Sequence, residues 1–153
     1  MKRLKTTFTL FALLAVFALA PRAGSACSCM VMTLEQQVDH AHRVFIGRLL
    51  EARVVFPDVE KRADSEAPSL LGEWERIEGI FEPLHRIRGE VEDREIVRTG
   101  LGGGDCGVRM EVGSVYMIFL DEDDPRIGIC DGSRQIDRFD LEETVLELKS
   151  LVD

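Results

Sequence analysis

The chain has 153 residues, 45% of them hydrophobic, and carries 28 acidic against 19 basic residues, a formal charge of −9. Its length suits one domain with a hydrophobic core of its own. The acidic balance argues against nucleic acid and anionic membrane surfaces as partners, because the protein would approach either of them against electrostatic repulsion.

Residues 1 to 26 have the three parts of a secretory signal peptide. A basic start is followed by an apolar run from Phe8 to Ala20 and then by small residues. The run is too short for a membrane span, which needs about 20 apolar residues. Gly24 and Ala26 place small side chains at positions −3 and −1 of a cut before Cys27. We therefore predict that the mature protein begins at Cys27.

Removal of this leader makes the protein more acidic. Residues 1 to 26 contain four of the basic residues and none of the acidic ones, so residues 27 to 153 carry 15 basic against 28 acidic residues, a formal charge of −13. We expect this mature part to be a single domain and a monomer, secreted to the extracellular space or the periplasm, with no membrane contact after cleavage. Lipidation at Cys27 is the alternative to plain cleavage, although Gly24 stands where a lipoprotein signal prefers an aliphatic residue.

The mature chain has four cysteines, Cys27, Cys29, Cys106 and Cys130. In an exported domain they favour disulfides over a zinc site, since an oxidising compartment removes the thiolates that a metal needs. A bond between Cys27 and Cys29 would close a strained ring around one residue, which leaves two long-range pairings open. Either pairing closes loops of ~80 to ~100 residues, which the chain-entropy model values at roughly 4 to 5 kcal/mol per bond.

The start of the mature chain predicts a short helix and then a long strand. Thr33-Leu34-Glu35-Gln36 has the form of a capping box, which predicts a helix to about His42. From Val44 to Phe56 apolar residues alternate with polar ones, which predicts a strand with Leu50 on its buried face.

The next part of the chain predicts a loop and two further strands. Pro57 to Leu71 contains two prolines and mixed charges without a period, which is typical of a loop. Trp74 to Arg88 predicts the second strand, with an edge position or a bulge at Pro83. Arg94 to Thr99 predicts the third strand.

The last part predicts two strands and a closing helix. Val115 to Leu120 is the most apolar segment and is predicted to be the central strand, and a short fifth strand is predicted to end at Cys130. Asp140-Leu141-Glu142-Glu143 has the form of a helix cap. The helix that follows has apolar residues at helical spacing, namely Leu141, Val145, Leu148 and Val152.

Five strands, flanking helices and no alternation of strand and helix predict an all-β domain. The architecture that fits best is a small closed or partly open barrel of the OB-fold type, five-stranded, with a C-terminal helix packed on the sheet.

The sequence shows no arrangement for catalysis. No Ser-His-Asp or Cys-His pattern is recognisable, and every cysteine is expected to be bridged. The run Gly102-Gly103-Gly104 lacks the Lys-Ser/Thr pair of a P-loop, and Asp121 to Asp124 lack the spaced ligands of an EF-hand. We therefore predict a protein that is not an enzyme, has no catalytic residues and holds no cofactor of its own.

Several short motifs between Cys27 and Asp131 occur together in one known family. The motifs are Cys27-Ser28-Cys29, Gln36-Gln37, Val44-Phe45-Ile46, Ile87-Arg88-Gly89, Asp105-Cys106-Gly107-Val108, Val112-Gly113, Tyr116 and Cys130-Asp131. With this set the chain resembles the inhibitory N-terminal domain of the tissue inhibitors of metalloproteinases, in a single-domain form without their second subdomain.

The resemblance implies a netrin-like OB-fold and one of the two cysteine pairings. As in the family, Cys27 would pair with Cys106 and Cys29 with Cys130. The family's third disulfide in this domain has no counterpart, since Asp39 stands where its first cysteine would fall.

The resemblance also implies that the protein inhibits zinc metalloendopeptidases through its mature N-terminus. In the family the α-amino nitrogen and carbonyl oxygen of the first cysteine, here Cys27, chelate the zinc of the partner protease. Ser28 would point into the first primed-side pocket of that protease. The other expected contacts are Cys29, Met30, Gly103, Gly104 and Asp105.

The alternative function on the same fold is a non-inhibitory netrin-like module that binds another exported protein or has a structural role, since a fold does not determine a function. Pro57 to Leu71 corresponds to a protease-contacting region of the family but shares no recognisable residues with it. An unmodified Cys27 at the N-terminus is necessary for the inhibitor and irrelevant to the module.

Overall fold

The computed structural model of the protein describes residues 27 to 56, 76 to 102 and 105 to 152. The predicted signal peptide lies outside the described residues, as do the predicted loop from Pro57 to Leu71 and the candidate contacts Gly103 and Gly104. Within the described ranges, no helix is both long and apolar enough to cross a membrane.

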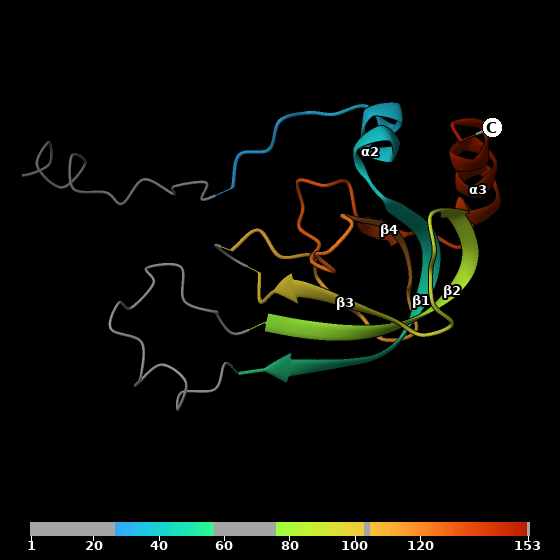
Figure 1. Ribbon diagram of the computed structural model, residues 1–153. Coiled ribbons are helices and arrows are strands. Elements are labelled where there is room, and N and C mark those ends of the chain that lie inside the picture. The colour runs from blue at the N-terminus through green and yellow to red at the C-terminus, as the bar shows by residue number, and fades with distance from the viewer. Residues whose placement is uncertain (1–26, 57–75, 103–104, 153) are drawn as a thin grey trace, which may run out of the picture.

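Five antiparallel strands form one sheet in the order β3-β2-β1-β4-β5 (Figure 1). The strands are β1 (Arg43–Val55), β2 (Arg76–Arg88), β3 (Glu95–Gly100), β4 (Val115–Leu120) and β5 (Arg134–Ile136). β1 pairs with β2 on one side and with β4 on the other. The chain ends in helix α3 (Leu141–Ser150), so the predicted all-β fold with a C-terminal helix is confirmed.

β4 is the most apolar strand but not the central one, which corrects the prediction. Both of its faces are covered. Tyr116, Ile118 and Leu120 belong to one hydrophobic cluster, whereas Met117 and Phe119 belong to the other. A strand buried on both faces needs apolar residues at consecutive positions wherever it lies in the sheet. The continuous hydrophobicity of β4 therefore reflects burial on two sides.

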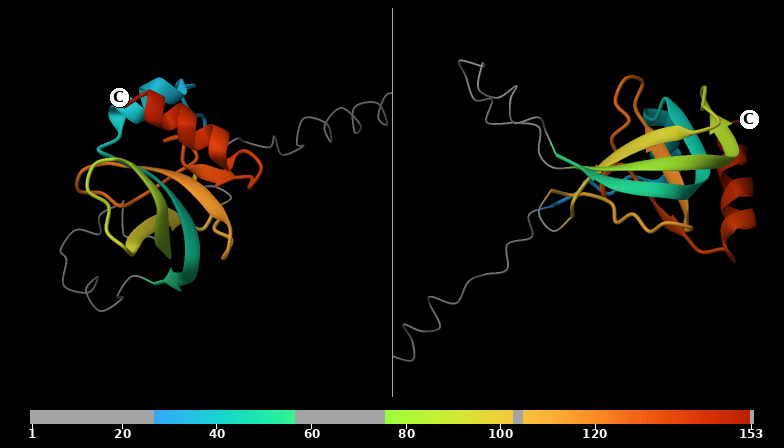
Figure 2. Two further views of the ribbon diagram at one scale, coloured as in Figure 1. Left: turned by 90° about the vertical axis from the view of Figure 1, so that its right-hand side faces the viewer. Right: turned by 90° about the horizontal axis from the view of Figure 1, so that it is seen from below.

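The sheet is curved but does not close into a barrel (Figure 2). β3 and β5 are its edges, and across the gap beside β3 the described residues form one bridge, between Arg98 and Arg126. The Arg98 N–H donates to the Pro125 carbonyl and the Ile127 N–H donates to the Arg98 carbonyl, each over 2.8 Å. The arrangement is OB-like, and of the two predicted forms the structure has the partly open one rather than the closed barrel.

The fifth strand lies further along the chain than the sequence predicts. In the stretch before Cys130, the described residues form a β-bridge only at Arg126, and β5 comes after Cys130. The chain turns between them, because the Asp131 carboxylate accepts hydrogen bonds from the N–H groups of Gly128 and Ser133. A local side-chain acceptor of this kind competes with strand pairing.

One face of the sheet carries a cluster centred on three aromatic rings. Phe45 and Phe81 lie 6.4 Å apart and Phe81 and Tyr116 lie 5.6 Å apart, both pairs edge to face, which is a preferred geometry for aromatic rings. The Tyr116 hydroxyl accepts from the Glu111 N–H and donates to the Arg109 carbonyl, so this buried polar group is satisfied. The other members are Leu49, Val97, Val108, Ile118, Leu120 and Ile127.

The other face of the sheet is covered by two helices, α2 (Leu34–His40) and α3 (Figures 1 and 2). Val38 of α2 is buried there, and so are Val145 and Leu148 of α3. These side chains share a cluster with Ala41, Val44, Ile46, Met117 and Phe119. The predicted apolar stripe of the C-terminal helix is therefore confirmed at its two central positions.

The helix caps agree with the sequence at α2 but not at α3. The Thr33 hydroxyl accepts from the Gln36 N–H and the Gln36 side-chain oxygen accepts from the Thr33 N–H, which completes the predicted capping box. Asp140 precedes α3 but its side chain makes no capping bond. Instead the Asp137 carboxylate accepts a hydrogen bond from the Phe139 N–H, and the Asp137 carbonyl accepts one from the Asp140 N–H. The turn before α3 therefore already holds Asp140 in helical geometry.

A bulge in β1 changes which leucine faces the core. Leu49 pairs with Phe81 and Glu51 with Ile80, so Leu50 is an extra residue in β1. An extra residue shifts every later side chain to the opposite face. Leu49 is fully buried and Leu50 is 38% exposed. The predicted apolar face of this strand is therefore wrong at Leu50, and it is also wrong at Val54 and Phe56, which are 49% and 66% exposed.

β2 is irregular at Pro83, as predicted. β3 pairs with β2 only from Arg76 to Phe81, so Pro83 lies beyond the paired part on that side. Toward β1 the register shifts between His85 and Pro83. Both the edge position and the bulge that a proline requires are therefore present.

The two neighbouring leucines provide a matched test of the bulge. Leu49→Ala should lower the free energy of unfolding by about 2 to 5 kcal/mol because it leaves a cavity in the core. Leu50→Ala should lower it by less than about 1 kcal/mol because the side chain is partly in water. Urea unfolding of both variants measures the difference, and equal losses would contradict the register.

Candidate functional site

Two disulfide bonds hold the N-terminal segment, residues 27 to 32. Cys27 is bonded to Cys106 and Cys29 to Cys130, with Cα atoms 5.8 and 5.0 Å apart. Of the two long-range pairings that the sequence leaves open, this is the one that the family resemblance implies. The bonds join positions 79 and 101 residues apart, so the segment is attached to loops from the distant half of the chain.

Most of the N-terminal segment faces solvent although it is attached covalently. Cys27 is half-buried, whereas Ser28 and Cys29 are exposed. Met30 is 84% exposed and Val31 is 95% exposed. In Figure 1 the segment, in blue, runs from α2 toward the side of the molecule away from α3. An extended, apolar and solvent-facing stretch is therefore held in place at one end of the protein.

The two loops that receive the disulfides are joined to each other. The Ile129 N–H donates to the Cys106 carbonyl over 2.9 Å. Gly128 passes the same carbonyl so closely that an added Cβ would lie 3.1 Å from its oxygen. Cys106 itself has a φ of 59°, a left-handed conformation that is uncommon for a residue with a side chain. Both disulfides therefore end on one connected unit.

Asp105 shapes the loop before Cys106. Its carboxylate accepts hydrogen bonds from the N–H groups of Leu101, Gly102 and Gly107, over 2.6, 2.8 and 3.1 Å. The chain folds so tightly here that a Cβ on Gly107 would lie 2.4 Å from the Gly100 carbonyl oxygen. Asp105 was predicted as a protease contact. The residue is exposed, but its carboxylate points into the loop.

The pKa of Asp105 reflects this use of its carboxylate. Burial in the loop would raise the pKa, but the N–H groups of Gly107, Gly102 and Leu101 favour the ionised form and bring the pKa below its ordinary value of 3.8. The ionised carboxylate therefore stabilises the loop at neutral pH.

Asp131 has the corresponding position after Cys130. Burial raises the pKa of Asp131, and the N–H groups of Gly128 and Ser133 act in the opposite direction. The next residue, Gly132, lies against the Gln37 side chain, and the Gln37 amide donates to the Met32 carbonyl over 3.5 Å. The turn after Cys130 thus connects the second disulfide to α2 and to the end of the N-terminal segment.

The structure brings together part of the predicted site and adds residues that the sequence analysis did not assign to it. Cys27, Ser28, Cys29, Met30 and Asp105 belong to one disulfide-linked unit. The additions are the exposed Leu101 and Ile129, which flank the bridged loops, and the turn at residues 128 to 133. The Asp-Gly-Ser sequence at 131 to 133 is a turn signal that could have indicated it.

Neither a metal-binding group of side chains nor a match to a known protein assigns a function to this site. Within the part of the chain that the structure describes, no three His, Cys, Asp or Glu side chains are grouped so that they could hold a metal ion. No protein-family model matches the chain, and the search of curated proteins found no match.

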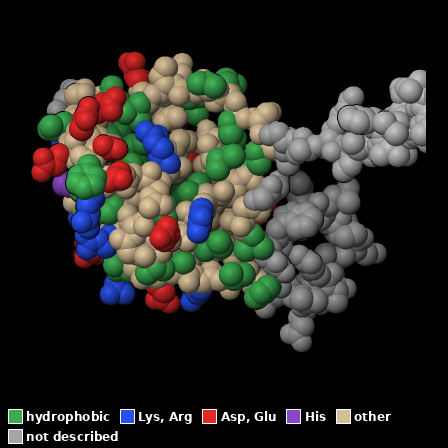
Figure 3. Space-filling model, turned by 180° about the vertical axis from the view of Figure 1, so that it is seen from behind, with side chains coloured by type: hydrophobic (Ala, Val, Ile, Leu, Met, Phe, Trp, Pro, Cys, Tyr) green, Lys and Arg blue, Asp and Glu red, His purple; other side chains and the backbone are tan. Residues whose placement is uncertain are grey.

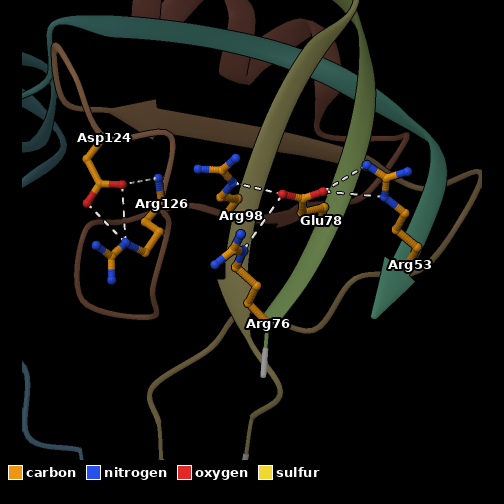
Figure 4. Close-up of polar contacts among 6 residues, drawn as sticks. All are labelled: Arg53, Arg76, Glu78, Arg98, Asp124 and Arg126. Atoms are coloured by element: carbon orange, nitrogen blue, oxygen red, sulfur yellow. Dashed lines mark hydrogen bonds and ion pairs between the residues drawn. The ribbon is translucent and has the colours of Figure 1, made fainter. Parts of the chain in front are cut away.

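A second polar cluster lies across the strands, and its geometry indicates a structural role. Glu78 is buried on β2, and Figure 4 shows Arg53 of β1 and Arg98 of β3 pointing toward it. Arg53 donates to one carboxylate oxygen over 3.0 and 3.3 Å, and Arg98 donates to the other over 3.0 Å. The Arg53 hydrogen bond, followed by that of Arg98, lowers the pKa of Glu78 although burial opposes it. The cluster joins three neighbouring strands.

The Asp105 loop generates a prediction with a defined pH dependence. Asp105→Asn should lower the free energy of unfolding by about 1 kcal/mol at pH 7, because an amide cannot accept all three N–H groups. A carboxylate whose pKa is lowered in the folded state stabilises above its unfolded value of 3.8 and loses that effect as the pH falls through its folded pKa.

The difference between wild type and Asp105→Asn should therefore be constant above about pH 5 and shrink below pH 3.8. Urea unfolding at several pH values measures it. Asp123→Asn, in the exposed acidic turn, is the matched control and should differ little from wild type at any pH. A difference for Asp105→Asn that does not change with pH would count against the hydrogen-bonded carboxylate.

Proposed function

We propose that the exported protein inhibits zinc metalloendopeptidases with its mature N-terminus. The observation that carries the proposal is the attachment of an exposed N-terminal segment, through both disulfides, to two hydrogen-bonded loops. A segment with a purely structural role would be expected to bury its apolar side chains, yet Met30 and Val31 face solvent.

The chemistry of inhibition requires an N-terminal residue at position 27. The α-amino nitrogen and the carbonyl oxygen of Cys27 form a five-membered chelate with the catalytic zinc of the protease. The chelate takes the open coordination position and displaces the water that the metal would activate. An α-amine has a reference pKa of about 8, so it loses its proton at little cost near neutral pH. The zinc is a constituent of the partner protease and not of the inhibitor.

The neighbouring side chains supply the protein contacts. Ser28 is exposed and enters the first primed-side pocket of the protease. Cys29 and Met30 follow it along the substrate groove, and Gly103, Gly104 and Asp105 are the further contacts that the family resemblance implies. Leu101 and Ile129, each about half exposed, extend the apolar contact around the two bridged loops.

Rigidity is what makes a chain terminus suitable for this task. Termini are usually poorly ordered, and ordering a chain on binding lowers affinity. Two disulfides order the segment before it binds the protease, so most of the entropic cost of ordering is removed from the binding step. They also fit export to an oxidising compartment, extracellular or periplasmic, after removal of residues 1 to 26.

An alanine added before Cys27 tests the chelation directly. The addition turns the α-amine of Cys27 into an amide, which does not ligate zinc, so inhibition should fall at least 100-fold. The thermal midpoint should change little, because the segment is exposed. Inhibition constants against a panel of purified zinc endopeptidases measure the effect.

The matched control carries the same alanine after Asp153 and should inhibit like the wild type. Equal inhibition by the N-terminally extended protein would refute the chelation. Failure of the wild type to inhibit any protease of a broad panel would replace the proposal with the non-inhibitory binding module.

Removal of the second disulfide separates rigidity from chemistry. The double variant Cys29→Ser with Cys130→Ser keeps the Cys27 amine and its own disulfide but loosens the segment that follows. Inhibition should weaken by roughly tenfold, because ordering the loosened side chains now opposes binding. The inhibition constants of the variant and the wild type are compared by slow-binding kinetics. The measurement is made at a temperature where circular dichroism shows the variant to be folded. Unchanged inhibition would show that the disulfide is not needed for preorganisation.

A further inference from the structure

The outer face of helix α3 carries apolar side chains that no described part of the protein covers. Successive residues of an α-helix are about 100° apart, so Leu146 lies roughly 200° around the helix from the buried Leu148. Leu146 is 69% exposed, and Phe139, just before the helix, is 87% exposed. Phe139 belongs to the turn that precedes the helix, and it lines the same hollow as Leu146.

The hollow that these two side chains line is shallow and has a volume of about 690 Å³. The hollow is lined by Phe139, Glu142, Glu143, Leu146, Glu147 and Ser150. Isolated exposed leucines are common on protein surfaces. An exposed phenylalanine and a leucine in the same hollow, with polar residues around them, instead have the composition of a small interface core with a polar rim.

The rim of the hollow is negatively charged. Its three titratable lining residues are all glutamates, and neither Arg138 nor Lys149 lines it. Figure 3 shows acidic side chains gathered around hydrophobic ones on the side of the molecule where α3 lies. A basic partner would be attracted to this face, whereas anionic membrane surfaces and nucleic acid would be repelled.

We propose that the outer face of α3, defined by the six residues of the hollow, binds a basic amphipathic segment of another protein. Phe139 and Leu146 receive one or two apolar side chains of that segment. Glu142, Glu143 and Glu147 pair with lysines or arginines that flank them. Aromatic anchors surrounded by a polar rim are the usual centres of binding energy in interfaces of this kind.

This surface is independent of the N-terminal segment. α3 and the exposed N-terminal segment lie at opposite sides of the molecule in Figures 1 and 2. A partner on α3 therefore leaves Ser28 and Met30 uncovered, and both surfaces can be occupied at once. The variant with an added alanine before Cys27 should bind the basic partner like the wild type, so failure of one proposal does not affect the other.

A designed peptide tests the proposal. The probe is a helical peptide of about 14 residues with leucines on one face and lysines on the other. Isothermal titration calorimetry with the exported protein measures binding at low salt. We expect binding that weakens at least tenfold in the double variant Phe139→Ser with Leu146→Ser. The triple variant Glu142→Gln, Glu143→Gln and Glu147→Gln should weaken it roughly tenfold, since exposed charge pairs contribute little individually.

Two matched controls exclude non-specific attraction. Phe56→Ser removes a 66% exposed aromatic ring at the far end of β1, and binding should not change. Neutralising Asp121, Glu122 and Asp123, which are exposed in the turn after β4, changes the net charge by the same amount as the α3 triple variant and should leave binding within about twofold of wild type. Circular dichroism should show that every variant is folded.

Three outcomes would overturn the proposal. The first is no measurable binding at millimolar peptide. The second is equal weakening by the α3 and turn variants, or binding that survives the Phe139→Ser, Leu146→Ser change, since either would mean attraction by net charge alone. The third is self-association of the wild type in analytical ultracentrifugation that this double variant abolishes, because a second copy of the chain would then be the occupant.

Discussion

The covalent attachment of Cys27 and Cys29 is the constraint on which the candidate site depends. Residues 27 to 32 belong to no helix or strand, and Met30 and Val31 contribute almost nothing to the core. Without the disulfides, little would oppose the conformational entropy of this exposed stretch. With them, the segment has one location, although it makes few of the contacts that normally order a chain. The position of the site is thus decided by two bonds rather than by burial.

The two disulfides would give the N-terminal segment little rigidity if the loops that contain Cys106 and Cys130 were mobile. Local hydrogen bonds hold these loops in place. Asp105 precedes Cys106 and Asp131 follows Cys130, and each carboxylate collects backbone N–H groups of its own loop. The hydrogen bond from Ile129 to the Cys106 carbonyl then joins the loops. The hydrophobic clusters lie elsewhere, on the two faces of the sheet. Core packing forms the fold, while carboxylate-capped turns and disulfides form the site.

Patterns in the sequence predicted the features that depend on residues close together in the chain. They failed for the features that depend on contacts between residues far apart in the chain. The capping box at Thr33, the irregularity at Pro83 and the buried stripe of α3 follow from spacing alone, and all are present. Leu50 was assigned to the core because alternation does not reveal a bulge, which arises from pairing with β2. The sequence left open whether the barrel closes, because closure also depends on pairing between distant strands. In the candidate site the four cysteines were evident from the sequence. The hydrogen bonds of Asp105 to its own loop were not, because they form only once the loop has folded.

The long sequence separation of the two disulfides also determines when the site can form. Cys27 and Cys29 have their bonding partners 79 and 101 positions later in the chain. During synthesis the N-terminal segment therefore emerges long before Cys106 and Cys130, and it has no partner for a long-range disulfide until β1, β2 and β3 have followed. The second bond requires all of β4 to have emerged as well. The site can therefore be completed only after four of the five strands have been made, although its first residues precede all of them. An incompletely synthesised chain carries these residues without their geometry.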